Sequence, residues 1–135
     1  MSRPKMEQRT RTFNIDVLRL CRQLPKDPAG WEVGKQLVRS SGSVGANHRA
    51  SGRAKSPADF THKLEVVLEE ADECHYWLTI IKEADLLSSS ELDRLIGEAN
   101  ELTAIFTTSV KTAKRNQEQK EKEAKKRRQK PPSGD

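Results

Sequence analysis

The sequence predicts an all-α protein, an up-and-down antiparallel four-helix bundle with basic, flexible ends. Apolar residues recur three and four positions apart in four separate segments, a spacing typical of amphipathic helices. No segment alternates Val, Ile or Thr with polar residues as strands do. The 135 residues are 33% apolar and 33% charged, which favours one polar domain with a modest core over a large multidomain enzyme.

The first two predicted helices differ in composition. Residues 12–24 form the first, which carries apolar residues spaced four, three and four apart: Phe13, Val17, Leu20 and Leu24. Residues 1–11 are predicted to be a disordered basic arm. Two prolines within Pro25–Gly30 end the first helix, and the second is predicted over residues 31–53. Its many small residues lower helix propensity but allow close approach, so tertiary packing must stabilise it.

The third and fourth predicted helices carry the longest apolar seams. Ser56–Asp59 combines a capping serine, a proline in the first turn and an acidic residue three positions after the cap. A helix is predicted from there over residues 57–84, with the seam Phe60, Leu64, Val67, Ala71, Cys74, Leu78 and Ile81. Ser88–Glu91 is a second capping box, and the fourth helix is predicted over residues 89–116. We expect these two helices to form an antiparallel hairpin that the first two cover.

The bundle is thus predicted over residues 12–116, and the rest of the chain is predicted to behave differently. Residues 117–135 are expected to be a charged helical extension followed by a disordered tail. The extension contains four consecutive basic side chains: Lys125, Lys126, Arg127 and Arg128. Such a run is typical of a nucleic-acid-binding arm. The alternative is a solvated tail that only aids solubility, since no aromatic residue is present there to stack on bases.

The formal net charge of +5 conceals an uneven distribution. Residues 1–55 carry twelve basic and four acidic side chains (+8), residues 56–110 carry three and twelve (−9), and residues 111–135 carry ten and four (+6). A surface of one sign can bind a phosphate backbone, or it can pair with an opposite surface of another protein. Both function classes stay open.

Basic residues of the second predicted helix recur at i, i+4 spacing, which places each pair on one face. Lys35 is paired with Arg39 in this way, and Arg49 with Arg53. Cations on one helix face can contact successive phosphates. The predicted nucleic-acid surface comprises Lys35, His48, Arg49, Arg53 and Lys55.

Arg39 has a competing interpretation. It lies within the small-residue segment, so we expect it to pair with an acidic residue of the third helix, Glu70 or Glu73, inside the bundle or between subunits. Trp77 lies outside the basic clusters. It is therefore expected to be a packing or interface anchor and not a base-stacking platform.

Catalysis has no support in the sequence. No nucleophile and base stand in a recognisable motif, and no glycine-rich phosphate loop follows a strand, so we expect no enzymatic activity and no cofactor. Asp72 and His75 have the Asp-x-x-His spacing that invites a comparison with di-iron bundles. The second copy of that motif is missing, so no metal site is expected.

Localisation follows from two observations. Cys21 and Cys74 cannot build a disulfide framework and are expected to be buried free thiols of a reducing compartment. No secretory signal and no run of about 20 apolar residues is found, so the protein is predicted to be cytoplasmic.

Residues 36–47 read Gln-Leu-Val-Arg-Ser-Ser-Gly-Ser-Val-Gly-Ala-Asn. This segment resembles the Q-L-x-R-[AS]-x-x-S-[IV]-x-x-N signature of the bacterial four-helix-bundle proteins encoded in 23S rRNA intervening sequences. That family also includes the accessory variability proteins of diversity-generating retroelements. Lys55-Ser56, Asp59-Phe60 and Glu69–Leu78 are similar to its third-helix pattern.

The resemblance implies a non-catalytic bundle that forms a ring-shaped homo-oligomer, commonly a pentamer. It further implies binding to RNA or DNA, or to a nucleic-acid enzyme such as a reverse transcriptase, through a basic surface. Gln36, Ser43 and Asn47 of the signature are expected at helix or subunit contacts. Ala50 stands where many members have a glutamate, so the role of that glutamate does not carry over.

The leading hypothesis is an oligomeric bundle that binds nucleic acid without catalysis. The first alternative is a protein-interaction adaptor that assembles by charge complementarity and makes no nucleic-acid contact. A metal-dependent helical enzyme is the third hypothesis.

Overall fold

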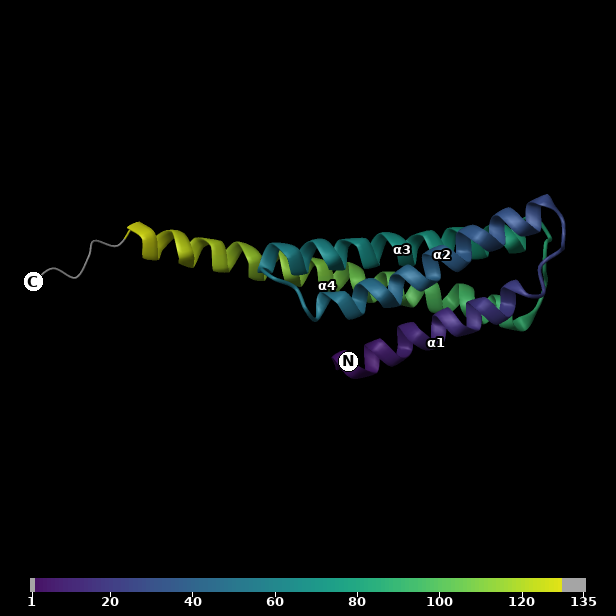
Figure 1. Cartoon of the computed structure of the whole chain (residues 1–135), viewed down its shortest axis with the longest axis horizontal. Helices are drawn as coiled ribbons and strands as arrows, with labels where there is room; N and C mark the ends of the chain where they lie inside the picture. Colours follow the sequence, from purple (N-terminus) through teal and green to yellow (C-terminus); the bar gives the residue numbers. More distant parts are fainter. Residues whose placement is uncertain (1, 130–135) are drawn as a thin grey trace, which may run out of the picture.

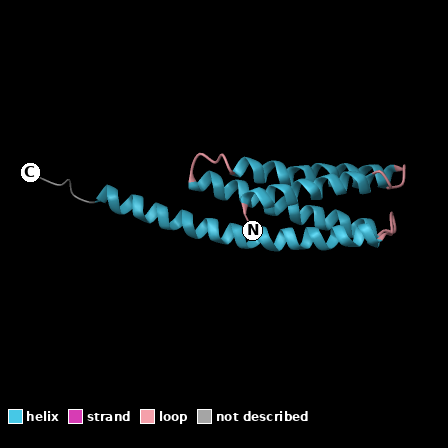
Figure 2. Cartoon of the chain, turned by 90° about the horizontal axis from the view of Figure 1, so that it is seen from below, coloured by secondary structure: helices cyan, strands magenta, loops and turns pink. Residues whose placement is uncertain are grey.

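Each of the four apolar segments is a helix in the structure, a computed structural model that describes residues 2–129 (Figure 1). The helices are α1 (Arg3–Cys21), α2 (Pro28–Ser51), α3 (Pro57–Glu83) and α4 (Ser90–Gln129). Figure 2 shows helices joined by short loops, and no strand occurs over the described range. The predicted all-α four-helix bundle is confirmed. No described helix is long and apolar enough to cross a membrane.

Successive helices run antiparallel, so the start of α1 lies at the same end of the bundle as the loop between α2 and α3 (Figure 1). α2 packs against α1 and α3, and α3 packs against α4. The interface between α1 and α4 is the least extensive of the four. Ion pairs cross it, including Arg94 to Asp16 at 2.8 Å.

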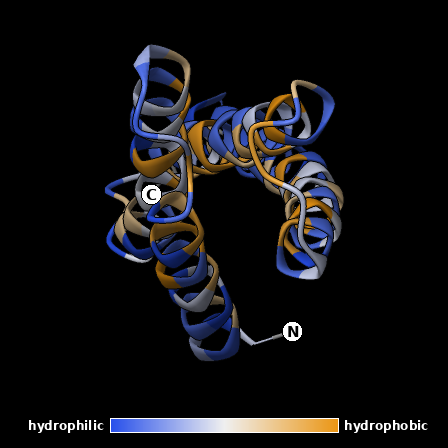
Figure 3. Ribbon diagram, turned by 90° about the vertical axis from the view of Figure 1, so that its right-hand side faces the viewer, coloured by the Kyte–Doolittle hydropathy of each residue, from blue (hydrophilic) through white to orange (hydrophobic). Residues whose placement is uncertain are grey.

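The core is formed by one apolar stripe from each helix. Seen along the bundle, the apolar positions gather where the helices face one another (Figure 3). The fully buried large side chains include Phe13, Leu20, Leu37, Leu78, Ile81, Leu92, Leu95, Leu102 and Phe106. The predicted seams are therefore the core, with two deviations. In α4, Ser109 was predicted in the seam but is only half-buried, and its neighbour Val110 is buried. Phe60 is only half-buried, because it lies at the end of the bundle.

Side chains cap the starts of the helices. The carboxylate of Asp27 accepts from the Gly30 amide at 2.9 Å, and Ser56 accepts from the Asp59 amide at 3.0 Å. Ser89 accepts from the Leu92 amide at 3.1 Å. These bonds satisfy backbone donors that have no partner within the helix. The predicted start of α3 is confirmed, whereas Ser89 caps α4 in place of the expected Ser88.

The predicted disordered arm over residues 1–11 is wrong for residues 3–11, which are the first turns of α1. Met6 and Thr10 are buried and continue the stripe of Phe13 toward the N-terminus at spacings of four and three. Ser2 caps this longer helix by accepting from the Lys5 amide at 3.3 Å. Residue 1 lies outside the described residues. At its other end α1 stops at Cys21, three residues before the predicted end.

The bounds of α2 also differ from the predicted 31–53. Pro28 begins the helix, because a proline is tolerated in the first turn and Asp27 supplies the cap. Gly30 approaches the preceding loop so closely that a Cβ there would lie 1.9 Å from the Pro25 carbonyl oxygen. The helix ends at Ser51, so Arg53 lies in the following turn.

α4 continues well past the end of the bundle, as Figures 1 and 2 show. Ala113 is its last buried residue. The expected helical extension is confirmed as far as Gln129, and at ~1.5 Å per residue it reaches roughly 20 Å beyond the bundle. The disordered tail predicted beyond it, residues 130–135, lies outside the described residues.

Candidate nucleic-acid interface

The predicted contact between the second and third helices forms around Arg39. Its guanidinium lies between two α3 carboxylates, with Nη1 3.2 Å from Glu70 Oε2 and Nη2 donating to Glu73 Oε2. The Arg39 hydrogen bond holds the pKa of Glu73 below its usual 4.5. Trp77 Nε1 donates to the other oxygen of Glu73 at 3.3 Å. Arg39 is thus neutralised within the subunit, as its position in the small-residue segment predicted.

The other signature residues of α2 form hydrogen bonds within that helix. Gln36 Nε2 donates to Glu32 Oε1 at 2.9 Å. Asn47 Nδ2 donates to both the carbonyl oxygen and the hydroxyl of Ser43, each at 2.8 Å. All three signature side chains are half-buried. Their contact with another subunit stays a prediction.

His48 does not lie on the predicted basic surface, and this part of the prediction is corrected. The residue is only 5% exposed, and its ring packs 5.7 Å from that of Phe106. Burial lowers the pKa of His48, and the charge of Arg3 lowers it further. The neutral imidazole is the form that a core tolerates. His48 was grouped with Arg49 because the two residues are neighbours in the sequence. Consecutive side chains on a helix point in different directions, so this proximity does not put His48 on the same surface.

Four of the predicted cations are exposed on α2 or just after it. Lys35 and Arg49 share one face of α2, about 21 Å apart at ~1.5 Å per residue. Arg53 and Lys55 belong to the loop before α3, so Arg53 does not prolong the face of Arg49 as predicted. Within residues 2–129, no carboxylate lies within 4.0 Å of any of these four charged groups.

Arg11 extends this surface onto α1, and the sequence analysis missed it. Arg11 and Arg49 line opposite sides of a groove of about 470 Å³ between α1 and α2. The two helices approach closely there, since a Cβ on Gly45 would lie 3.6 Å from Thr10 Oγ1. Among the residues that the structure describes, Glu7 is the one carboxylate that lines the groove. Extending the apolar stripe of α1 back to Met6 was the signal that would have placed Arg11 on a helix.

The basic run of the α4 extension is separate from α2. Lys125, Lys126, Arg127 and Arg128 are all exposed on the part of α4 that projects from the bundle (Figure 1). The structure therefore offers two basic regions, one on the bundle and one on the extension. We define the basic surface as these residues: Arg11, Lys35, Arg49, Arg53, Lys55, Lys125, Lys126, Arg127 and Arg128.

The outward side of α3 has the opposite charge. Glu69, Asp72, Tyr76 and Glu83 are exposed at spacings that place them along one face. Tyr76 is 55% exposed among these carboxylates. We call these four residues the acidic face. Among residues 2–129, no three His, Cys, Asp or Glu side chains gather as they would around a metal ion.

The sequence matches the family described as 23S rRNA-intervening sequence protein over residues 4–108. A similar solved structure is that of a protein of unknown function from the S23 ribosomal protein family of Bacteroides thetaiotaomicron. Its TM-score is 0.74 at 26% identity, and the match covers 82% of this chain and 99% of that one. No curated protein matches the chain. The family match spans the bundle and stops before the α4 extension.

Proposed function

Since the chain belongs to the 23S rRNA-intervening sequence protein family, we propose that it is a non-catalytic bundle that binds nucleic acid, structured RNA foremost. The basic surface is the proposed site of contact. One observation carries the proposal. The cations of the basic surface have no carboxylate within 4.0 Å among the described residues, whereas several cations elsewhere are paired, such as Arg9, Arg39 and Arg94.

Cations without an internal carboxylate partner bind phosphate more favourably than paired ones. A cation that already pairs with a carboxylate gains little from a phosphate, because the existing ion pair must first be broken. Cations with no internal partner keep their full charge for a phosphate backbone, and each phosphate that they neutralise releases condensed counterions. Such contacts orient the nucleic acid but do not read its sequence.

Charge reversal tests the proposal. In the variant Arg49→Glu/Arg53→Glu, the dissociation constant for a structured RNA should rise by about tenfold or more at low salt, as measured by fluorescence anisotropy. The matched control is Arg22→Glu/Lys26→Glu, which changes the net charge equally. Arg22 and Lys26 are also exposed and have no carboxylate within 4.0 Å among the described residues, but they lie outside the basic surface, at the opposite end of the bundle from Arg49 and Arg53. Equal losses in both variants, or no RNA binding by the unchanged protein, would overturn the proposal.

The second candidate function is a protein-interaction adaptor, and the acidic face favours it. A basic surface on one subunit can pair with the acidic face of another copy, or of a protein partner such as a reverse transcriptase. Heterologous contacts of this kind close into a ring only at a fixed subunit number, for which the resemblance suggests five.

Light scattering at two ionic strengths separates the two candidates. Assembly by charge complementarity predicts an oligomer that dissociates when salt is added, and a variant Glu69→Lys/Asp72→Lys that stays monomeric at low salt. If salt and the variant leave the molar mass unchanged while RNA binding is lost at high salt, the nucleic-acid function stands alone.

A further inference from the structure

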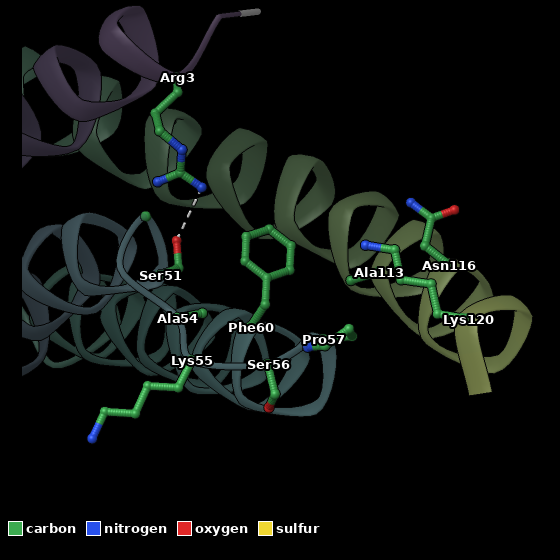
Figure 4. Close-up of a pocket in the computed structure, with 11 residues that line it drawn as sticks. Arg3, Ser51, Ala54, Lys55, Ser56, Pro57, Phe60, Ala113, Asn116 and Lys120 are labelled. Atoms are coloured by element: carbon green, nitrogen blue, oxygen red, sulfur yellow. Dashed lines mark hydrogen bonds between the residues drawn. The ribbon is translucent and has the colours of Figure 1, made fainter. Parts of the chain in front are cut away.

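The end of the bundle where α1 begins contains a cleft outside the basic surface described above, apart from Lys55 at its rim (Figure 4). Two adjoining hollows of about 490 and 680 Å³ share the residues Arg3, Phe60, Ala113 and Asn116. The start of α1, the loop between α2 and α3, and the part of α4 that leaves the bundle surround them. We call the two hollows together the end cleft. Its size suits a small organic ligand.

The floor of the end cleft is apolar and partly aromatic. Phe60, Leu64, Ile105 and Phe106 contribute to it. The ring of Phe60 is half-buried and stands between the loop after α2 and the exposed stretch of α4 (Figure 4). An accessible aromatic ring is a surface on which a nucleobase can stack.

Arg3 is positioned at the cleft by two hydrogen bonds to the end of α2. Its Nη1 donates to the His48 carbonyl oxygen at 3.1 Å, and its Nη2 donates to Ser51 Oγ at 3.2 Å. The guanidinium carbon lies 6.0 Å from the centroid of the Phe60 ring. Because a guanidinium has five N–H donors, these two bonds leave donors for an anion. Gly52 leaves room for the Arg3 guanidinium, since a Cβ at position 52 would lie 3.2 Å from Arg3 Nη1.

The charged side chains that line the end cleft in the described part of the chain are positive. Lys120 lines it from α4, and its ammonium group points toward Phe60 in Figure 4. Lys55 also lines the rim, although its ammonium group is turned away from Phe60. Among residues 2–129, no aspartate or glutamate lines either hollow. This charge favours an anionic ligand.

One polar side chain in the cleft can bond the edge of a base. Asn116 supplies both a donor and an acceptor. His48 also lines the larger hollow, but it is only 5% exposed and its Nδ1 is buried, so we assign it no bond to the base.

We propose that the end cleft holds one unpaired nucleotide of a single-stranded nucleic-acid segment, with its base on Phe60 and its phosphate between Arg3 and Lys120. Asn116 bonds the edge of the base. The proposal rests on the proposed function and names the part of the nucleic acid that is recognised. Paired bases are stacked inside a helix and cannot enter the cleft, so recognition there selects unpaired segments.

The test compares a single-stranded RNA of twelve nucleotides with a fully paired duplex of the same sequence. Phe60→Leu, which removes the ring but keeps an apolar side chain, should weaken single-strand binding by about tenfold and duplex binding by less than about twofold. Tyr76→Leu on the acidic face is the matched aromatic control and should change neither. Equal effects of Phe60→Leu on both RNAs, or no effect on either, would overturn the proposal.

Lys120→Gln provides a second variant that does not touch the core, since Lys120 is exposed on α4. It should weaken single-strand binding by about threefold to tenfold, whereas Arg22→Gln at the far end should not. If Lys120→Gln and Arg22→Gln have the same effect on the single strand, the phosphate does not lie in the end cleft.

Ring resonances of His48 report occupancy without a mutation at the site. The single-stranded RNA should shift them, and the duplex should not. A shift caused by a nucleoside 5′-monophosphate but not by the RNA would mean that the cleft takes a free nucleotide, which contradicts the proposal. No shift with either probe would also contradict it.

The failure of this inference is distinguishable from the failure of the proposed function. If Arg49→Glu/Arg53→Glu weakens binding of both RNAs while Phe60→Leu and Lys120→Gln weaken neither, the protein binds nucleic acid but not through the end cleft. If the unchanged protein binds neither RNA, the proposed function is wrong, and the inference falls with it.

Discussion

Arg9 on α1 forms two parallel hydrogen bonds with the Glu98 carboxylate on α4, and the bond from Nε to Oε2 is 2.9 Å long. Glu101 accepts a third bond from Arg9 at 3.1 Å. The side chains of Arg9 and Glu98 are only 23% and 20% exposed. Because the α1–α4 interface is the least extensive in the bundle, this bidentate pair is expected to contribute measurably to holding α1 in place.

Removing this pair should destabilise the fold. Arg9→Met should lower the free energy of unfolding by about 1–3 kcal/mol, as measured by urea denaturation, because it strands the partly buried Glu98 carboxylate. The same substitution in a Glu98→Gln background should cost clearly less. Arg11→Met is the control and should stay within about 0.5 kcal/mol of the unchanged protein. Equal costs for Arg9→Met in both backgrounds would show that the two side chains are not coupled.

The Arg39–Glu73 pair should make stability depend on pH. The Arg39 hydrogen bond holds the pKa of Glu73 below 4.5, so the pair stabilises the folded state above that pH. This contribution is lost as the pH falls through the lowered pKa. The gap in melting temperature between the unchanged protein and Arg39→Met should therefore be constant from about pH 7 to about pH 5 and should shrink at lower pH. Lys35→Met, which removes no ion pair, should show no such trend.

A gap for Arg39→Met that persists unchanged at about pH 3 would contradict this account. In that case the contribution of Arg39 would come from the packing of its aliphatic stem and not from its charge.

Two glycines should respond oppositely to alanine. Gly30→Ala should destabilise the protein by roughly 1–3 kcal/mol, because the added Cβ would meet the Pro25 carbonyl oxygen at 1.9 Å and the backbone would have to move. Gly97→Ala lies on α4 with no atom within 4 Å of its Cβ position. It should stabilise the protein by about 0.5–1 kcal/mol, since alanine is the better helix former. Thermal unfolding of both variants measures the two effects. A loss of stability in Gly97→Ala would contradict the prediction for that position.

The fold could be predicted from the sequence because the heptad seams of α3 and α4 are long and unbroken. The start of α1 was missed because Thr10 interrupts the apolar stripe between Met6 and Phe13. Its hydroxyl is accommodated by donating to the Met6 carbonyl oxygen at 3.0 Å, which a pattern of apolar residues does not reveal. The predicted start of α2 at residue 31 is three residues late because Pro28 in the sequence resembles a helix breaker, whereas proline is tolerated in a first turn.

The candidate site was only partly predictable. The pairing of Arg39 with Glu70 and Glu73 could be predicted because Arg39 lies within the small-residue segment and the third helix is acidic. The burial of His48 was also predictable, because this residue comes four positions after Val44 and continues the buried stripe of Leu37, Ser41 and Val44 on α2. The end cleft is lined by three segments that are far apart in the sequence, so no local motif predicts it.

The salt dependence of RNA binding tests the central claim most directly. If the basic surface binds phosphates, the logarithm of the association constant should fall linearly with the logarithm of the salt concentration. The neutralising variant Arg49→Gln/Arg53→Gln should make that slope shallower by about two, one for each lost phosphate contact. An affinity that does not change with salt, or a slope that the variant leaves unchanged, would contradict the account.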